Sequence, residues 1–501
     1  MTTPLIRPSI VTVPHANVLM GESFASTRPE LTLLKNSPHV SVAIVGSGAC
    51  GLTAALMLKD HGVECVLLER DERPRGSSAL SSGFVPAAGT QAQARQAIED
   101  DQAQFVKDIV NKSHGQSALH LVKAYVSAVP QAIDALEARH GVTWRVLDQF
   151  LYPGHSTHRM HAVPETSGEG LMSRLERAAQ EADLTLLTHA QVTQLFMDPN
   201  DRVVGLGFVR PDGSREALRC DAALLACNGY GGDQDLVAQY LPQMKAAVYA
   251  GHVGNDGTAV RWGQALGVAL KDMGAYQGHG SWQNELGLLI SWALMVAGGI
   301  QINAHGVRFH DEHQGYSEAS VGVLAQPGGV AWCVFDQPVY ELGLTFPEFK
   351  EAQVLGGVKR FESVTALSLW VGCPEETLAR TLSAQDRARD QEEGQPEGHS
   401  KSIRPLKPLK PLKPPLYAIK VTGALFHTQG GLDIDECCHV LGAQGTPLPN
   451  LWAAGGAARG VSGQEVWGYL SGNGLLSALA GGFIAAESIA RALAHPSTRV
   501  D

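Results

Sequence analysis

A buried strand that runs into a glycine turn and then a helix constrains this chain most strongly. Four apolar residues precede Gly46, and the spacing of Gly46, Gly48 and Gly51 is that of the dinucleotide-binding fingerprint. The first glycine permits a tight turn, the second lets a pyrophosphate approach the backbone, and the third lets the helix pack close to the strand. The free N–H groups at the start of the helix, near Ala49, favour phosphate oxygens. This stretch predicts a dinucleotide site in an α/β domain.

A second predicted strand supports this interpretation. Residues 64–69 are mostly apolar and end at Glu69, which is followed by Arg70. An acidic residue about 20 positions beyond the glycines binds a ribose hydroxyl in such domains. We therefore expect an adenosine ribose without a 2′-phosphate, which favours FAD or NAD over NADP. The alternative is a glycine turn in an ordinary α/β unit with an exposed Glu69.

Further segments rich in small residues are candidates for close cofactor contact. Residues 75–83 predict a loop that offers hydroxyl and amide hydrogen bonds to a flat ligand, although a surface loop would share this composition. Residues 222–226 predict a strand that ends in glycines, and Asp256 either caps the next helix or touches the cofactor. The predicted cofactor-binding residues of these segments and of the C-terminal region are Ser77, Ser78, Ser82, Gly83, Val192, Ala226, Asn228, Gly229, Asp256, Gly455, Gly456, Ser471, Asn473 and Leu475.

The composition excludes several classes of protein. Hydrophobic residues at 44% and charged residues at 18% are typical of a well-packed enzyme and not of a disordered chain. A net charge of −11 without a long basic block makes nucleic acid an unexpected partner. The 8 cysteines form no CxxC pair, so we expect no disulfide framework, no metal site and a reducing, cytoplasmic compartment. No membrane span is expected, and the apolar stretch 286–302 is predicted to be protein core.

A length of 501 residues predicts two domains. Residues 1–38 form an arm, 39–273 and 427–501 form the nucleotide-binding domain, and 274–426, where glycine-turn strands thin out, form an inserted domain. Near the end of the insertion, prolines recur at every third residue in 405–415, which favours polyproline II with lysines along one edge. This repeat is either a surface spacer or a basic docking patch.

These segments together resemble the FAD-dependent fumarate reductase and 3-ketosteroid dehydrogenase flavoproteins. Residues 226–232 are similar to their Ala-Thr-Gly-Gly element with Cys227 and Asn228 substituted, and 427–431 are similar to their His-Thr-Met-Gly-Gly. Residues 453–456 are similar to their Ala-Ala-Gly-Glu, except that Gly456 replaces an acid that touches the ribityl chain. The resemblance implies non-covalent FAD, a glutathione-reductase-type Rossmann-like FAD-binding domain, an inserted α+β capping domain over the isoalloxazine, and hydride transfer through flavin N5.

The active-site positions of the resemblance differ from those of fumarate reductases. Residues 306–312 match a motif of those enzymes that ends in an acid. Four residues beyond this acid those enzymes have an arginine proton donor, whereas this chain has Tyr316. Their C-terminal arginine becomes Tyr469, while their two substrate histidines match His279 and His427. A dicarboxylate taken out of water needs fixed cationic donors, so fumarate itself is disfavoured. The tyrosine pair instead resembles that of the 3-ketosteroid dehydrogenases, in particular the Δ4-(5α) subgroup.

This resemblance implies the α,β-desaturation of a cyclic ketone, either a steroid or a smaller oxocyclohexane. Tyr316 would accept the α-proton as general base. Tyr469, with a backbone N–H near Gly472, would stabilise the enolate oxygen. A histidine, His279 or His427, would assist the base or bind a substrate carboxylate, although each of these side chains could instead serve packing. The alternatives are a reductase of an activated alkene or enoate, and an electron-transfer flavoprotein without its own substrate; the electron acceptor (oxygen, quinone or carrier) stays open.

Overall fold

The computed structural model describes residues 11–14, 33–198, 200–383 and 411–495. Most of the predicted arm and most of the predicted Lys-Pro repeat lie outside these residues.

The chain divides into two compact units. The first comprises Met1–Leu241, Gly251–Tyr276 and His427–Asp501, and the second comprises Pro242–Ala250 and Gln277–Phe426.

A nine-stranded sheet forms the centre of the first unit. Its order is β1-β8-β9-β10-β2-β3-β7, and β21 pairs with both β10 and β20. Pairs among β21, β10, β2, β3 and β7 are parallel, whereas β1, β8, β9 and β20 join by antiparallel pairs. Parallel strands with a helix between β2 and β3 confirm the predicted Rossmann-like α/β fold. The strands are β1 Val11–Pro14, β2 His39–Val45, β3 Cys65–Leu68, β7 Thr185–Leu187, β8 Gln191–Met197, β9 Val203–Val209, β10 Arg215–Leu225, β20 His439–Leu441 and β21 Pro447–Ala453.

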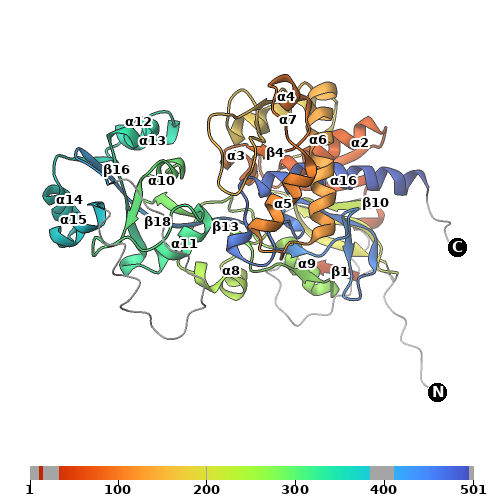
Figure 1. Cartoon of the computed structure of the whole chain (residues 1–501). Coiled ribbons are helices and arrows are strands. Elements are labelled where there is room, and N and C mark those ends of the chain that lie inside the picture. Colours follow the sequence, from red (N-terminus) through yellow and green to blue (C-terminus); the bar gives the residue numbers. More distant parts are fainter. Residues whose placement is uncertain (1–10, 15–32, 199, 384–410, 496–501) are drawn as a thin grey trace, which may run out of the picture. The chain divides into compact units, whose positions relative to one another are not determined.

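Two apolar helices lie side by side in this unit (Figure 1). Ten of the twelve residues of α2, Ala49–Asp60, are buried because this helix packs on β2 and β3 and also on α16, Asn473–Ala494. By length and composition alone α16 could cross a membrane, but 67% of its apolar window is buried and it packs on α2 and α6. Such burial is typical of a core helix. The other helices are α3 Gly76–Leu80, α4 Gln91–Arg95, α5 Gln102–Lys112, α6 Leu119–His140, α7 Gly168–Glu181, α8 Gln234–Tyr240 and α9 Thr258–Leu266, with 3-10 turns η4 Gly455–Ala457 and η5 Val466–Gly468.

Short strands complete the first unit. They form a three-stranded sheet, β4-β6-β5, and the pair β12-β19. Their bounds are β4 Val85–Pro86, β5 Arg145–Val146, β6 Met160–Ala162, β12 Leu270–Lys271 and β19 Gly431–Leu432.

The second unit contains its own sheet and its own apolar core. The sheet has the order β14-β13-β18-β16-β15, with β11 and β17 also paired to β18. Helices cover it, and the core gathers around Phe335, Phe349 and Ile419, each fully buried. The predicted core stretch 286–302 is confirmed by the burial of Ile290, Leu294 and Met295 in the same cluster. The elements are η1 Pro242–Met244, β11 Val248–Tyr249, β13 Tyr276–Gln283, β14 Leu288–Leu289, α10 Ala293–Val296, β15 Ile300–Ile302, α11 Tyr316–Leu324, η2 Pro327–Gly329, β16 Val330–Asp336, α12 Gln337–Gly343, α13 Pro347–Val354, β17 Lys359–Phe361, α14 Val364–Val371, α15 Glu375–Ser383 and β18 Leu416–Thr428.

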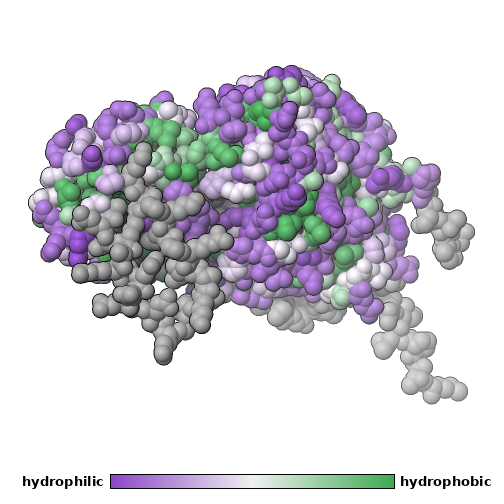
Figure 2. Space-filling view, in the orientation of Figure 1, coloured by the Kyte–Doolittle hydropathy of each residue, from purple (hydrophilic) through white to green (hydrophobic). Residues whose placement is uncertain are grey.

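Hydrophilic residues cover most of the described surface on the face shown in Figure 2, and smaller hydrophobic patches lie between them. A few large apolar side chains are exposed in the second unit, namely Val307, Val354, Leu355, Leu369 and Trp370. Scattered exposed apolar residues of this kind are normal on folded proteins.

Candidate active site

The glycine turn of the first unit depends on close backbone contacts at two of its glycines. Gly46 has a φ of +96°, and a Cβ there would lie 2.6 Å from the carbonyl oxygen of Ala226. A Cβ on Gly51 would lie 2.0 Å from the carbonyl oxygen of Gly46. No side chain fits at either place, so these two glycines are required by the protein's own packing.

Gly48 differs from its neighbours because the protein itself does not require it to be glycine. A Cβ there would meet only Ser78 Oγ, at 3.6 Å, which is an ordinary contact. The open space at Gly48 fits the predicted approach of a pyrophosphate to the backbone. The N–H of Ala49, in contrast, already donates to Ser78 Oγ at 3.2 Å.

Hydrogen bonds hold both carboxylate oxygens of Glu69 in the same turn. Its Oε2 accepts hydrogen bonds from Ser47 N at 3.0 Å and Ser47 Oγ at 2.5 Å, and its Oε1 accepts one from Asp71 N at 3.1 Å. Only 8% of Glu69 is exposed, so the alternative of an exposed residue at this position is wrong. Its binding to a ribose stays a prediction.

Arg70 and Asp256 form an ion pair within the first unit. Arg70 Nη1 lies 3.0 Å from Asp256 Oδ2 and also donates to the carbonyl oxygen of Gly254 at 3.2 Å. The other oxygen of Asp256 accepts from the N–H and the hydroxyl of Thr258, the first residue of α9. Asp256 therefore caps the start of α9, as one of the two predictions has it, and its contact with a cofactor stays a prediction.

The segment 75–83 is only partly a loop. Residues 76–80 form α3 because the N–H of Ala79 reaches back to the carbonyl oxygen of Arg75 and closes a helical turn, so the loop prediction is wrong there. Ser77 Oγ accepts from Asn255 Nδ2 at 2.7 Å and from His252 N. Ser82 is exposed.

Gly83 and Val192 are buried within the first unit. A Cβ on Gly83 would lie 2.5 Å from the carbonyl oxygen of Ser167, just before α7. Val192 is a core residue of β8, opposite Phe208 of β9.

A second glycine segment follows β10. The N–H of Ala226 donates to the carbonyl oxygen of Val45, and Asn228 adopts the left-handed conformation with a φ of +67°. A Cβ on Gly229 would lie 2.1 Å from Thr428 Oγ1, which also accepts from Tyr230 N. Thr428 therefore holds this turn, although the sequence did not single it out.

Gly456 lies directly against Asn228. A Cβ on Gly456 would stand 2.1 Å from Asn228 Oδ1 and 3.2 Å from the nitrogen of Gly229. Asn228 Oδ1 is itself held by the N–H of Gly229 at 2.9 Å. The neighbouring Gly455 packs on Cys50, where its Cβ would lie 3.2 Å from that of the cysteine.

The start of α16 carries the C-terminal candidates. Gly472 has a φ of +87° and precedes the helix, and the carbonyl oxygen of Ser471 accepts from His155 Nε2 at 3.0 Å. Asn473 is fully buried, with Nδ2 donating to Ser462 Oγ and Oδ1 without a partner among the described residues. Leu475 is buried in the core of the first unit.

The four candidate catalytic side chains fall into two pairs, one on each unit. In the first unit the rings of His427 and Tyr469 meet edge to face, with centroids 5.6 Å apart. A Cβ on Gly474 would lie 2.7 Å from His427 Nε2 and 3.7 Å from Tyr469 Oη, so the bare glycine leaves both polar ends beside the start of α16.

The protonation of this pair follows from its burial. Burial raises the pKa of Tyr469 far above its ordinary value, and hydrogen bonds from the backbone of Gly474 and Gly472 oppose the rise. Those bonds show that backbone amides approach the phenol oxygen, whose own proton stays in place at neutral pH. Burial also lowers the pKa of His427 to about 4, so its ring is neutral at pH 7.

In the second unit His279 and Tyr316 stack face to face, with centroids 4.8 Å apart and an angle of 18°. The N–H of Ser281 donates to His279 Nδ1 at 3.1 Å, so the single proton of the neutral ring lies on Nε2. Burial lowers the pKa of His279 to about 3. His279 therefore provides no positive charge to assist Tyr316.

Trp292 and the motif that contains Glu312 are structural in the second unit. Trp292 lies in the core, meets His279 edge to face, and donates through Nε1 to the carbonyl oxygen of Glu312. The carboxylate of Glu312 is fully buried, pairs with Arg308 and accepts from the N–H of Gln301. Trp292 therefore belongs to the core of the second unit, within the stretch 286–302 that the sequence predicts to be core.

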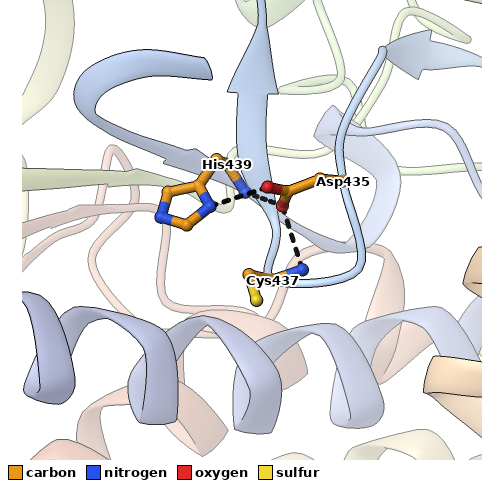
Figure 3. A group of neighbouring side chains, drawn as sticks. All are labelled: Asp435, Cys437 and His439. Atoms are coloured by element: carbon orange, nitrogen blue, oxygen red, sulfur yellow. Dashed lines mark hydrogen bonds and ion pairs between the residues drawn. The ribbon is translucent and has the colours of Figure 1, made fainter. Parts of the chain in front are cut away.

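One further group of possible metal ligands lies in the first unit. Asp435, Cys437 and His439 come from one turn (Figure 3) and are the one such group found within the described ranges. The carboxylate of Asp435 already accepts from the N–H groups of Cys437 and His439 and from His439 Nδ1, each at 2.9 Å. Burial raises the pKa of the Cys437 thiol, which disfavours the thiolate that binds metals. These hydrogen bonds explain why the three side chains lie together, since they stabilise the turn itself.

Comparison with known proteins agrees with this geometry. The FAD binding domain family matches residues 41–475. A probable fumarate reductase of Shewanella frigidimarina is 27% identical over 464 residues, which cover 91% of this chain and 75% of that protein.

Solved structures show the same fold. The open conformation of a flavocytochrome c3 fumarate reductase superposes with a TM-score of 0.76 at 24% identity, covering 95% of this chain and 85% of that one. The 3-ketosteroid-Δ4-(5α)-dehydrogenase of Rhodococcus jostii RHA1 gives 0.71 at 22% identity, covering 93% and 99%.

The fold and the glycine turns define a flavin-binding α/β protein. The chain belongs to the FAD binding domain family, and it is an FAD-dependent oxidoreductase. The relatives and solved structures to which it is similar include fumarate reductases and a 3-ketosteroid dehydrogenase.

Proposed function

We propose that this protein is an FAD-dependent desaturase that introduces a C=C bond α,β to the ketone of a cyclic substrate. The observation that carries the proposal is the environment of Tyr469. Its hydroxyl is buried beside the start of α16, approached by backbone amides, and protonated at neutral pH. A phenol whose oxygen accepts hydrogen bonds is a stronger donor through its own proton, which is what a developing enolate oxygen requires.

The chain's own groups then take the following roles. Tyr469 donates to the ketone oxygen. Tyr316, the first residue of α11, acts as a phenolate, accepts the proton from the α-carbon and becomes a phenol. His427, neutral at pH 7, supplies or receives a hydrogen bond without bringing a charge. FAD, when bound, supplies the acceptor for the β-hydride.

The charges of these groups favour a neutral ketone over a dicarboxylate. The pKa values of about 3 for His279 and about 4 for His427 leave both rings uncharged at pH 7. Tyrosines stand where the resembling fumarate reductases place arginines. A dianion would therefore lose its hydration without gaining fixed cationic partners from these four residues.

A reductase of an activated alkene is the second candidate, because the probable fumarate reductase that covers 91% of this chain carries that activity in its name. The same residues would serve in reverse, with Tyr316 as the proton donor to the α-carbon. The two functions differ in the substrate that exchanges electrons with the flavin, which is a saturated ketone for the desaturase and an activated alkene for the reductase.

Anaerobic mixing of the purified yellow protein with substrates tests both. Bleaching of the visible flavin band by a saturated 3-ketosteroid or oxocyclohexane, and its loss in Tyr316→Phe, is the result expected of a desaturase. Reoxidation of the chemically reduced protein by an enoate, with no bleaching by any saturated ketone, would overturn the desaturase in favour of the reductase.

A further inference from the structure

A chain of buried hydrogen bonds leads from the start of α16 to the ring of His427. Asn473 Nδ2 donates to Ser462 Oγ at 3.0 Å, Ser462 Oγ donates to Gln429 Oε1 at 2.8 Å, and Gln429 Nε2 lies 3.2 Å from His427 Nδ1. Asn473, Ser462 and Gln429 are at most 3% exposed, so water does not compete for these bonds. All four residues belong to the first unit.

The hydrogen bonds of this network all point one way, from Asn473 toward His427. Because Ser462 has one proton and accepts from Asn473, its proton goes to Gln429 Oε1, and the amide NH2 of Gln429 must face His427 Nδ1. The reverse direction needs both amides flipped, which would replace the unpartnered Oδ1 of Asn473 by an N–H in the same place. A buried N–H without an acceptor is rarer and less tolerated than a carbonyl oxygen without a donor, so the direction stated here is favoured.

The carbonyl oxygen of Thr428 opposes this arrangement. It also lies 3.2 Å from His427 Nδ1, and by itself it would draw the ring proton to Nδ1. The Gln429 NH2 needs Nδ1 as an acceptor and is itself strengthened by the chain behind it. Gln429 therefore decides between the two neutral forms of the ring.

We propose that Gln429 is a positioning residue that holds His427 in the form with its proton on Nε2, the nitrogen that lies beside Gly474. His427 then acts as a neutral hydrogen-bond donor toward a substrate oxygen. In the His-Thr-Met-Gly-Gly motif that residues 427–431 resemble, this position is a methionine, whose thioether has no proton to donate. The role of His427 toward substrate rests on the proposed function, whereas its protonation state does not.

Nitrogen-15 NMR of the FAD-loaded protein with labelled histidine tests this inference. The His427 signals are assigned by their loss in His427→Asn. The wild-type protein is expected to show an unprotonated Nδ1 and a proton on Nε2. Gln429→Met removes the amide donor and leaves Thr428, so the proton is expected to move to Nδ1. Gln429→Glu offers only acceptor oxygens and is expected to produce the same reversal.

Two controls separate this effect from a general disturbance. Gln283→Met replaces a glutamine of the second unit that is 4% exposed and is expected to leave the His427 signals unchanged. Full FAD loading of each variant shows that it has folded. A proton on Nδ1 in the wild-type protein, or an unchanged His427 signal in Gln429→Met, would overturn the proposal.

Activity gives an independent readout. If the desaturase function holds, Gln429→Met is expected to lower kcat by about 100-fold, the typical effect of losing one donor to a developing oxyanion, with a smaller change in KM. If no substrate is turned over, the proposed function fails while the NMR result still decides the role of Gln429.

Discussion

The side-chain oxygen of Asn228 occupies the space that a Cβ on Gly456 would need, only 2.1 Å from the Cβ position. Both residues are departures from the motifs of the resembling flavoproteins, which have glycine and glutamate there. The structure indicates that the two departures belong together, because the longer Asn228 fits only over a glycine. They form one coupled change at the predicted ribityl contact.

Gly456→Ala is therefore expected to weaken FAD binding by about 10-fold or more, since crowding a packed site typically costs about 1–3 kcal/mol. Titration of the apoprotein with FAD, followed by flavin fluorescence, measures the change. Gly442→Ala is the matched control, because a Cβ there would meet its nearest atom at an ordinary 3.5 Å. The double variant Asn228→Gly with Gly456→Glu should bind FAD better than Gly456→Glu alone; equal affinities would contradict the coupling.

Tyr469→Phe is expected to lower kcat by about 10²- to 10³-fold because it removes one donor to the oxygen that gains charge. FAD affinity should stay within about twofold, since the ring remains buried. Stopped-flow bleaching by the ketone substrate measures the rate, and absorbance at saturating FAD measures loading. Tyr240→Phe removes a hydroxyl that accepts from Gln264 near the surface and should change neither quantity. An unchanged rate in Tyr469→Phe would remove this residue from the mechanism.

Glu69→Gln is expected to destabilise the protein by about 1–3 kcal/mol and to weaken FAD binding. Ser47 donates twice to one oxygen and Asp71 N donates to the other, whereas an amide has only one acceptor oxygen and must turn its NH2 toward one of these donors. Urea unfolding of the apoprotein isolates the effect on stability. Glu64→Gln, at an exposed position five residues earlier, should stay within about 0.5 kcal/mol of the wild type.

The parts of this site that the sequence predicts are local ones. Gly46, Gly48 and Gly51 lie within six residues, and the turn with its flanking strands is enough to predict the α/β fold and a dinucleotide site. The choice of FAD comes from the resemblance. Glu69 follows from a fixed spacing along one βαβ unit. The resemblance adds His427 and Tyr469, because each lies in a short recognisable motif.

The parts that the sequence does not predict depend on contacts between distant segments. His155 donates to the carbonyl oxygen of Ser471, 316 residues further along the chain, and no local pattern marks it. Ser462 joins the hydrogen-bond chain of Gln429 from 33 residues away. Only Gln429 carried a signal, as the polar residue at the methionine position of its motif. Side-chain hydrogen bonds of this kind follow from the folded backbone, and so they become visible only with it.

Acid is expected to destabilise the protein below pH 6.5 through its buried histidines, among them His155 and His161 of the first unit. Burial lowers the pKa of His155 and of His161 to about 4 in the folded protein, against an ordinary value of 6.5. The unfolded chain therefore binds more protons between these values, and stability is complete above pH 6.5 and falls as the pH drops toward 4. A one-unit difference in pKa is worth about 1.4 kcal/mol, so each histidine contributes on the order of 3 kcal/mol of pH dependence.

Urea unfolding at a series of pH values between 4 and 7.5 measures this dependence. His161→Gln should be less stable at pH 7.5 but show a shallower loss toward pH 4, because one titrating group is gone. His305→Gln, at an exposed position, should leave the slope unchanged. A wild-type slope that His161→Gln does not reduce would show that other groups cause the acid sensitivity.

Arg159→Met is expected to cost about 3–5 kcal/mol of stability, because Arg159 is the fully buried cation that two carboxylates share. Arg159 pairs with Asp100 at 2.9 Å and Asp108 at 2.7 Å, and its guanidinium lies 4.5 Å from the ring centre of Phe105. Burial already raises the pKa of Asp100 against the effect of Arg159, so without the arginine both carboxylates are left buried without a counter-charge.

The control for this prediction is a surface pair of the same unit. Arg177 lies 3.8 Å from Glu181, both largely exposed, and Arg177→Met should change the free energy of unfolding by less than about 0.5 kcal/mol. Adding Asp100→Asn and Asp108→Asn to Arg159→Met should recover part of the loss, since no charge then stays buried. If Arg159→Met costs no more than Arg177→Met, the buried network does not stabilise the fold.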